Sequence, residues 1–155
     1  MLKRFEVEGF RNFDKRFVLD LADVRDYRFN SSAIEGDVIK CGIIYGRNAV
    51  GKTNLSNALF DISVNAGHSI LLRDESNYLS ASQGCVEASF SYSFSFESGD
   101  VEYSYTKASR RLLKKERLFV DGVLAFEYDH SQDELLDGDL SIIGADKLNW
   151  WFRTS

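Results

Sequence analysis

One stretch of the sequence has the residue types and spacing needed to hold phosphate groups. Residues Gly46–Thr53 fulfil the pattern G-x-x-x-x-G-K-[ST] of a phosphate-binding loop, also called the Walker A motif. Its glycines let the backbone curl so that successive N–H groups point at phosphate oxygens. The Lys52 ammonium would reach the β and γ phosphates, and the Thr53 hydroxyl would ligate Mg²⁺. The motif therefore predicts binding of a nucleoside triphosphate, ATP with Mg²⁺, by the residues Gly46, Arg47, Asn48, Ala49, Val50, Gly51, Lys52 and Thr53.

The segments on both sides of this loop have the patterns that such a site requires. Before the loop, Val38–Tyr45 is a nearly continuous apolar run, which predicts a strand buried on both faces. After it, apolar residues recur at helical spacing and define one face of a helix: Leu55, Ala58, Leu59, Ile62 and Ala66. The sequence therefore predicts a strand, a glycine loop and a helix over residues 38–66, with the positive end of the helix dipole at the loop.

The remaining patterns predict antiparallel strands. Leu2–Phe10 alternates apolar and charged residues, and a second short strand is expected at 16–21, joined to the first by a hairpin around 11–14. From 86 to 97 apolar side chains alternate with serine and glutamate, which is typical of a strand with one wet face. Asp121-Gly122 is a strong two-residue hairpin signal. We expect a meander of about four strands over 86–128 and an α/β fold.

Composition excludes several classes of protein. The 155 residues, 44% hydrophobic and 28% charged, suffice for one compact domain. No apolar run approaches the roughly 18 residues that cross a bilayer, and the N-terminus has no signal-peptide pattern. These features predict a cytoplasmic protein with no membrane contact. Cys41 and Cys85 have neither metal-binding nor disulfide-framework spacing.

Charge is distributed unevenly along the chain, although the net value is −5. Six basic residues fall between 107 and 117: Lys107, Arg110, Arg111, Lys114, Lys115 and Arg117. One interpretation is a set of salt-sensitive contacts to nucleic-acid phosphates. The other, which we prefer, is the solvated face of a meander strand whose lysines protect a sheet edge.

The phosphate loop and the N-terminus together resemble one family of ATPases. Gly46–Leu55 has the form G-x-N-x-x-G-K-[ST]-N-L, similar to the ABC-type ATPases of the SMC, Rad50 and RecF group and to the OLD-like AAA ATPases of bacterial defence. Gly9–Phe13 is similar to the short Asn/Arg-Phe element near the start of those chains. The resemblance implies that Arg11 and Asn12 approach the bound nucleotide. The alternative is that they form a polar hairpin turn while Phe10 and Phe13 pack.

Two further motifs of that family lack convincing counterparts here. Leu140–Asp146 is the nearest approximation to a Walker B strand, but Gly144-Ala145 interrupts it and Lys147 follows its acid. Leu79–Gln83 imitates the signature motif but precedes the strand expected from residue 86, so we interpret it as a serine-rich loop. Neither motif supplies what ATP hydrolysis needs.

We therefore expect a single N-terminal ATPase lobe, 1–155, within a longer protein that is an ATPase. Residues 1–70 would hold the nucleotide-binding strands, loop and helix, and 86–128 the antiparallel β-subdomain. The resemblance implies an ATP-driven switch or sensor in antiphage defence, in which a second copy of the head associates and controls an effector protein or domain. The alternatives are a DNA repair or recombination ATPase of the RecF or Rad50 type, with nucleic acid as partner, and a regulatory module that binds nucleotide without hydrolysing it.

Overall fold

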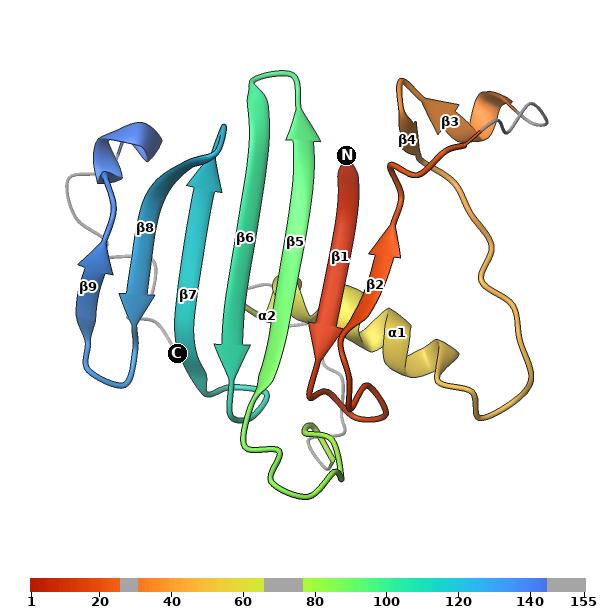
Figure 1. Ribbon diagram of the computed structural model, residues 1–155, viewed down its shortest axis with the longest axis horizontal. Helices are drawn as coiled ribbons and strands as arrows, with labels where there is room; N and C mark the ends of the chain where they lie inside the picture. Colours follow the sequence, from red (N-terminus) through yellow and green to blue (C-terminus); the bar gives the residue numbers. More distant parts are fainter. Residues whose placement is uncertain (26–30, 66–76, 145–155) are drawn as a thin grey trace.

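Seven antiparallel strands form one sheet in the order β2-β1-β5-β6-β7-β8-β9, and two short helices lie behind it (Figure 1). The computed structural model describes residues 1–25, 31–65 and 77–144. The sheet strands are β1 Leu2–Glu8, β2 Phe17–Asp20, β5 Ala88–Phe96, β6 Gly99–Lys107, β7 Leu113–Val120, β8 Val123–Asp129 and β9 Glu134–Asp137. The remaining elements are the hairpin β3 Ile34–Glu35 and β4 Val38–Ile39, the helices α1 Lys52–Leu59 and α2 Asp61–Asn65, and the 3-10 turns η1 Ser31–Ala33 and η2 Leu140–Ile143. The fold is thus mixed α/β.

The alternating pattern of the meander is confirmed by the burial of its strands. Phe90 and Tyr92 of β5 are almost completely buried, whereas the alternating serines Ser89, Ser91 and Ser93 are only partly buried. The predicted N-terminal hairpin is also present, as β1 and β2. Strand β1 pairs on its other edge with β5, so that the N-terminal hairpin and the meander share one sheet.

Turn chemistry fixes the register of the hairpin between β7 and β8. Val120 pairs with Val123, which leaves Asp121 and Gly122 as a two-residue loop. Both loop residues have positive φ, 50° and 76°, as a type I′ turn requires. The prediction from the Asp-Gly pair is therefore confirmed. Strand β9 was not predicted, because all four of its residues are exposed and its sequence has no apolar alternation.

The helices and the sheet enclose one aromatic core. Leu55 and Ala58 of α1 are buried against Phe5 of β1 and against Phe90 and Tyr92 of β5. Leu59 and Ile62 pack around this core, which confirms the predicted helical face over the described residues; Ala66 lies outside them. The single helix expected there is interrupted at Phe60, beyond which α2 begins.

The strand predicted before the phosphate loop is largely absent, and this prediction is wrong. Only Val38 and Ile39 are in strand conformation, paired with β3, and residues 40–50 are all exposed. Ile43 is 88% exposed and Tyr45 91%. A strand buried on both faces needs neighbours and two covering layers, and no described strand pairs with 40–45. An apolar run can indicate such burial, but it cannot supply the neighbouring strands.

Candidate functional site

Helix α1 begins at Lys52, within the predicted phosphate loop. Gly51 is the N-cap residue, with φ of 99°, and Ala49 also has positive φ, 64°. No side chain caps the helix start, and its first turn contains no acidic residue. The first N–H groups of a helix have no partner within the helix, so this end of α1 offers free donors and a positive dipole end.

The Lys52 side chain folds back across the loop that precedes it. Its ammonium donates hydrogen bonds to the carbonyl oxygens of Gly46 and Arg47, at 2.7 and 2.6 Å. Neither Lys52 nor Arg47 forms an ion pair with any described residue. The loop therefore carries two cationic side chains whose charge no protein carboxylate neutralises within the described chain. An anion is the ligand that this arrangement favours.

Arg11 and Asn12 lie against the first turns of α1, although forty residues separate them from it in sequence. Arg11 Nη1 donates to Asn54 Oδ1 at 3.2 Å, and Asn54 Nδ2 donates to Asn12 Oδ1 at 2.6 Å. The structure thus brings both residues to the helix that the phosphate loop opens. The packing expected of the alternative turn also holds, because Phe10 is buried and the Phe13 ring packs at a tilt against Phe17, with ring centroids 5.2 Å apart.

The two segments that resemble the Walker B and signature motifs do not form the strand and the helix that those motifs require. Leu140–Ile143 is the 3-10 turn η2, in which Ser141 N donates to Asp139 Oδ1, and not a strand. Residues 145 and 146 lie outside the described part of the chain. Residues 79–83 form no helix; Leu79 makes an isolated bridge to Phe10, and the rest is a serine loop held by hydrogen bonds between Ser80 and Ser82. The interpretation of this segment as a serine-rich loop is confirmed.

A buried polar cluster beneath the helices was missed by the sequence reasoning. Asp61 of α2 accepts hydrogen bonds from Lys107 Nζ at 2.9 Å, from the Tyr105 hydroxyl at 3.0 Å and from the Tyr78 hydroxyl at 3.1 Å. Burial lowers the pKa of the Lys107 ammonium, and the Asp61 carboxylate opposes this shift in part. Burial likewise raises the pKa of Tyr105 well above its ordinary value. The cluster fastens the helices to β6.

The period of strand β6 indicates that Lys107 is buried, although it belongs to the basic segment 107–117. In β6 the side chains of Val101, Tyr103, Tyr105 and Lys107 share one face, so Lys107 faces inward by alternation. It is only 1% exposed. The interpretation of 107–117 as the solvated face of a strand whose lysines protect a sheet edge is therefore wrong at its first residue. It is also wrong about the edge, because β7 pairs with β6 on one side and with β8 on the other. Lys115 and Arg117 do lie on the wet face, paired with Asp129 and Glu127.

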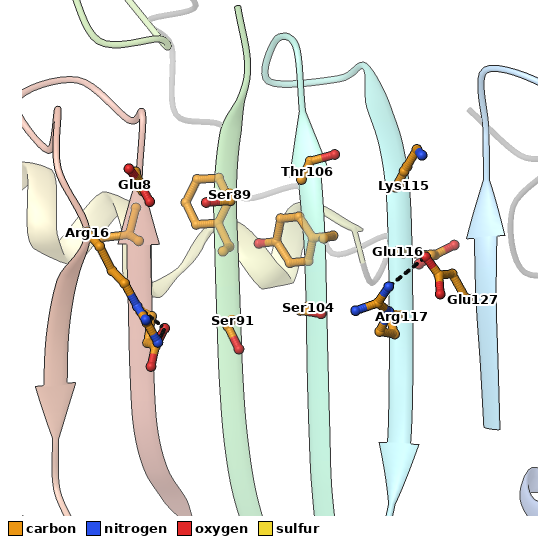
Figure 2. Close-up of a pocket in the computed structure, with 14 residues that line it drawn as sticks. Glu8, Arg16, Ser89, Ser91, Ser104, Thr106, Lys115, Glu116, Arg117 and Glu127 are labelled. Atoms are coloured by element: carbon orange, nitrogen blue, oxygen red, sulfur yellow. Dashed lines mark hydrogen bonds and ion pairs between the residues drawn. The ribbon is translucent and has the colours of Figure 1, made fainter. Parts of the chain in front are cut away.

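A hollow of about 290 Å³ lies over the opposite, polar face of the sheet, away from the phosphate loop. Figure 2 shows its floor of short side chains, Ser89, Ser91, Ser104 and Thr106, between charged side chains on either side. Those charges are largely paired within the protein. Arg16 contacts Glu6 at 2.5 Å, and Arg117 contacts Glu127 at 2.7 Å. We interpret this face as the solvated side of an antiparallel sheet and place the candidate site at the loop.

Comparison with known protein families and curated proteins found no match for the chain. Within residues 1–25, 31–65 and 77–144, no helix is long and apolar enough to cross a membrane. No three histidine, cysteine, aspartate or glutamate side chains gather into a potential metal site among the residues described. The candidate site therefore rests on the loop and its neighbours.

Proposed function

We propose that this chain binds a nucleoside triphosphate, ATP, through the loop Gly46–Thr53. The observation that carries the proposal is the combination of a complete phosphate-loop motif with an uncapped helix start and an ammonium folded over the loop. On nucleotide binding, the Lys52 hydrogen bonds to the loop carbonyls would be exchanged for bonds to phosphate oxygens. Arg11 and Asn12 would then lie beside the bound phosphates.

The residues present fit a Mg²⁺ ion that arrives with the nucleotide. Thr53 is exposed in the first turn of α1 and offers one hydroxyl oxygen, a hard ligand of the type that Mg²⁺ prefers. Since no cluster of acidic side chains gathers among the described residues, the phosphates and water would supply most other ligands. The ion would neutralise phosphate charge.

The arrangement favours binding over hydrolysis by these residues alone. Hydrolysis requires a group that orients the attacking water and carboxylates that hold the metal. The two segments that imitate the missing family motifs form a 3-10 turn and a serine loop instead. A module that binds ATP without hydrolysing it is therefore the second candidate function of the described chain.

For the whole protein we propose an ABC-type ATPase acting as a switch in antiphage defence. ATP would bring a second copy of the head into contact across the loop, and the pair would control an effector protein or domain. The exposed position of the loop and of residues 40–50 leaves room for such a contact. This proposal predicts an increase in mass on addition of ATP and Mg²⁺, measured by light scattering after size-exclusion chromatography. A DNA repair ATPase would instead show DNA-stimulated hydrolysis.

The binding proposal is tested by titrating the protein with ATP and Mg²⁺ in a calorimeter. Lys52→Ala should weaken binding by about tenfold or more, because charge-assisted hydrogen bonds to phosphate are lost. Lys40→Ala is the matched control, since Lys40 is a lysine outside the motif whose ammonium forms an ion pair with Glu35. If Lys52→Ala binds ATP as tightly as the Lys40 variant does, the proposed site is wrong.

A further inference from the structure

We propose that Asn54 is a positioning residue that holds Arg11 and Asn12 at the phosphate loop and thereby sets the affinity for the nucleotide. The inference rests on the proposed nucleotide binding and adds the device that assembles the site. Asn54 lies in the second half of the first turn of α1, next to Thr53 in sequence. Its side chain does not have to touch the ligand to act.

The Asn54 amide engages both of its neighbours at once. Its oxygen accepts from Arg11 Nη1 at 3.2 Å, and its nitrogen donates to Asn12 Oδ1 at 2.6 Å. A side chain with both an acceptor and a donor is needed for this pair of contacts, and asparagine is a short one. Asparagine is otherwise a weak helix former, so its place here calls for a compensating interaction, which these contacts provide.

The contact with Asn12 places that residue directly on the loop. A Cβ atom added to Gly51 would lie only 2.4 Å from Asn12 Nδ2. The Asn12 amide therefore occupies the space beside the backbone at which the glycine loop becomes the helix. Movement of Asn12 away from Asn54 would open this junction.

Arg11 has an unusual backbone conformation, and its guanidinium retains an N–H donor that makes no hydrogen bond within the described chain. The φ of Arg11 is 49°, in the left-handed region that few residues other than glycine adopt. Its backbone N–H donates a hydrogen bond to the Tyr78 carbonyl at 3.1 Å. Its Nε is buried without a hydrogen-bond partner, and its guanidinium lies 5.5 Å from the centre of the Phe10 ring. Arg11 forms no ion pair with a described residue. Only Asn54 fixes the guanidinium end of this side chain by a hydrogen bond among those residues, and its charge stays available for a phosphate oxygen.

The test is a mutant cycle on ATP affinity in the full chain. Asn54→Ala should weaken ATP binding by about tenfold, and Arg11→Ala by at least as much. If Asn54 acts through Arg11 and Asn12, adding Asn54→Ala to a variant that carries both Arg11→Ala and Asn12→Ala should weaken binding no further. A further loss of affinity in that background, or an unchanged affinity in Asn54→Ala alone, would overturn the proposal. Melting temperatures of all variants, without nucleotide, show whether a change in affinity merely follows a loss of folding.

Two comparisons keep this proposal separate from the binding proposal. Asn57→Ala removes a second asparagine of α1 that makes no side-chain hydrogen bond within the described chain, and it should leave affinity unchanged. Lys52→Ala reports on the site itself. If Lys52→Ala weakens binding and Asn54→Ala does not, the positioning role fails while the site stands. If the unmodified protein binds no ATP, the binding proposal fails first.

Discussion

Asp61 and Lys107 form an ion pair of 2.9 Å in the core, with only 5% and 1% of their side chains exposed. The pair joins α2, which follows α1 in the chain, to β6 of the sheet. The ammonium also lies within 6 Å of the ring centres of Tyr78 and Tyr105. The position of the helices over the sheet thus depends on charge as well as on apolar contact.

Removing one partner of this pair should destabilise the protein strongly. Lys107→Met leaves the Asp61 carboxylate buried without its cation, which costs about 3–5 kcal/mol. Urea unfolding followed by circular dichroism would measure the loss. The double variant Asp61→Asn, Lys107→Met should recover much of it, because the amide oxygen still accepts from the tyrosine hydroxyls. Equal losses in the single and double variants would mean that the pair does not carry the effect.

Gly51→Ala should disrupt the start of α1 for two separate reasons. The backbone there has φ of 99°, and the added Cβ would collide with the Asn12 amide. Gly84→Ala is the matched control, because Gly84 has φ of 84° and nothing within 4 Å of an added Cβ. Backbone strain of about 1–2 kcal/mol should appear in both variants. Only Gly51→Ala should also weaken ATP binding, as calorimetry can establish; equal affinities would contradict the assignment.

The stability of the β1–β2 hairpin should depend on pH through Glu6. Burial alone would raise the pKa of this carboxyl, but hydrogen bonds from Arg4 and Arg16 outweigh it and lower the pKa. A carboxyl with a lowered folded pKa adds stability above its unfolded pKa, and that stability is lost as pH falls through the folded value. Glu6→Gln should therefore flatten the acid end of the pH profile of the free energy of unfolding.

Glu8→Gln provides the reference for that experiment. Glu8 lies on the same strand and the same face, is exposed, and forms no ion pair with a described residue. Its replacement should leave the profile close to that of the unmodified protein. A profile that responds equally to both substitutions would contradict a special role of Glu6.

The local patterns of the sequence predict much of the sheet. Alternation along 86–97 and the Asp121-Gly122 pair correctly predicted β5 and the β7–β8 hairpin, because strand period and turn type are set by neighbouring residues. The apolar run at 38–45 failed, because burial on both faces depends on strands elsewhere in the chain. Strand β9 is held by its pairing with β8 and has no pattern of its own.

The candidate site likewise has a part that could be predicted from the sequence and a part that could not. Gly46–Thr53 is contiguous, so its glycines, lysine and threonine are visible as one motif. The contacts of Asn54 with Arg11 and Asn12 join segments that are distant in sequence, and only the resemblance to a family suggested that they meet. The ion pair between Asp61 and Lys107 could not be predicted from the sequence. Strand alternation predicts that a lysine faces the core, but it does not identify the carboxylate that pairs with it.

The position of β1 in the sheet has a consequence for how the chain folds during synthesis. Phe5 of β1 pairs with Tyr92 of β5, so β1 can pair with β5 only after the segment between these two residues has been synthesised. Helix α1 is synthesised after β1 and before β5. At that point the chain still lacks Phe90 and Tyr92, which share the buried core with Leu55. Contacts this distant in sequence slow folding. The glycine loop thus acquires its rigid support late, and a nascent chain halted before β5 should be sensitive to proteases at α1.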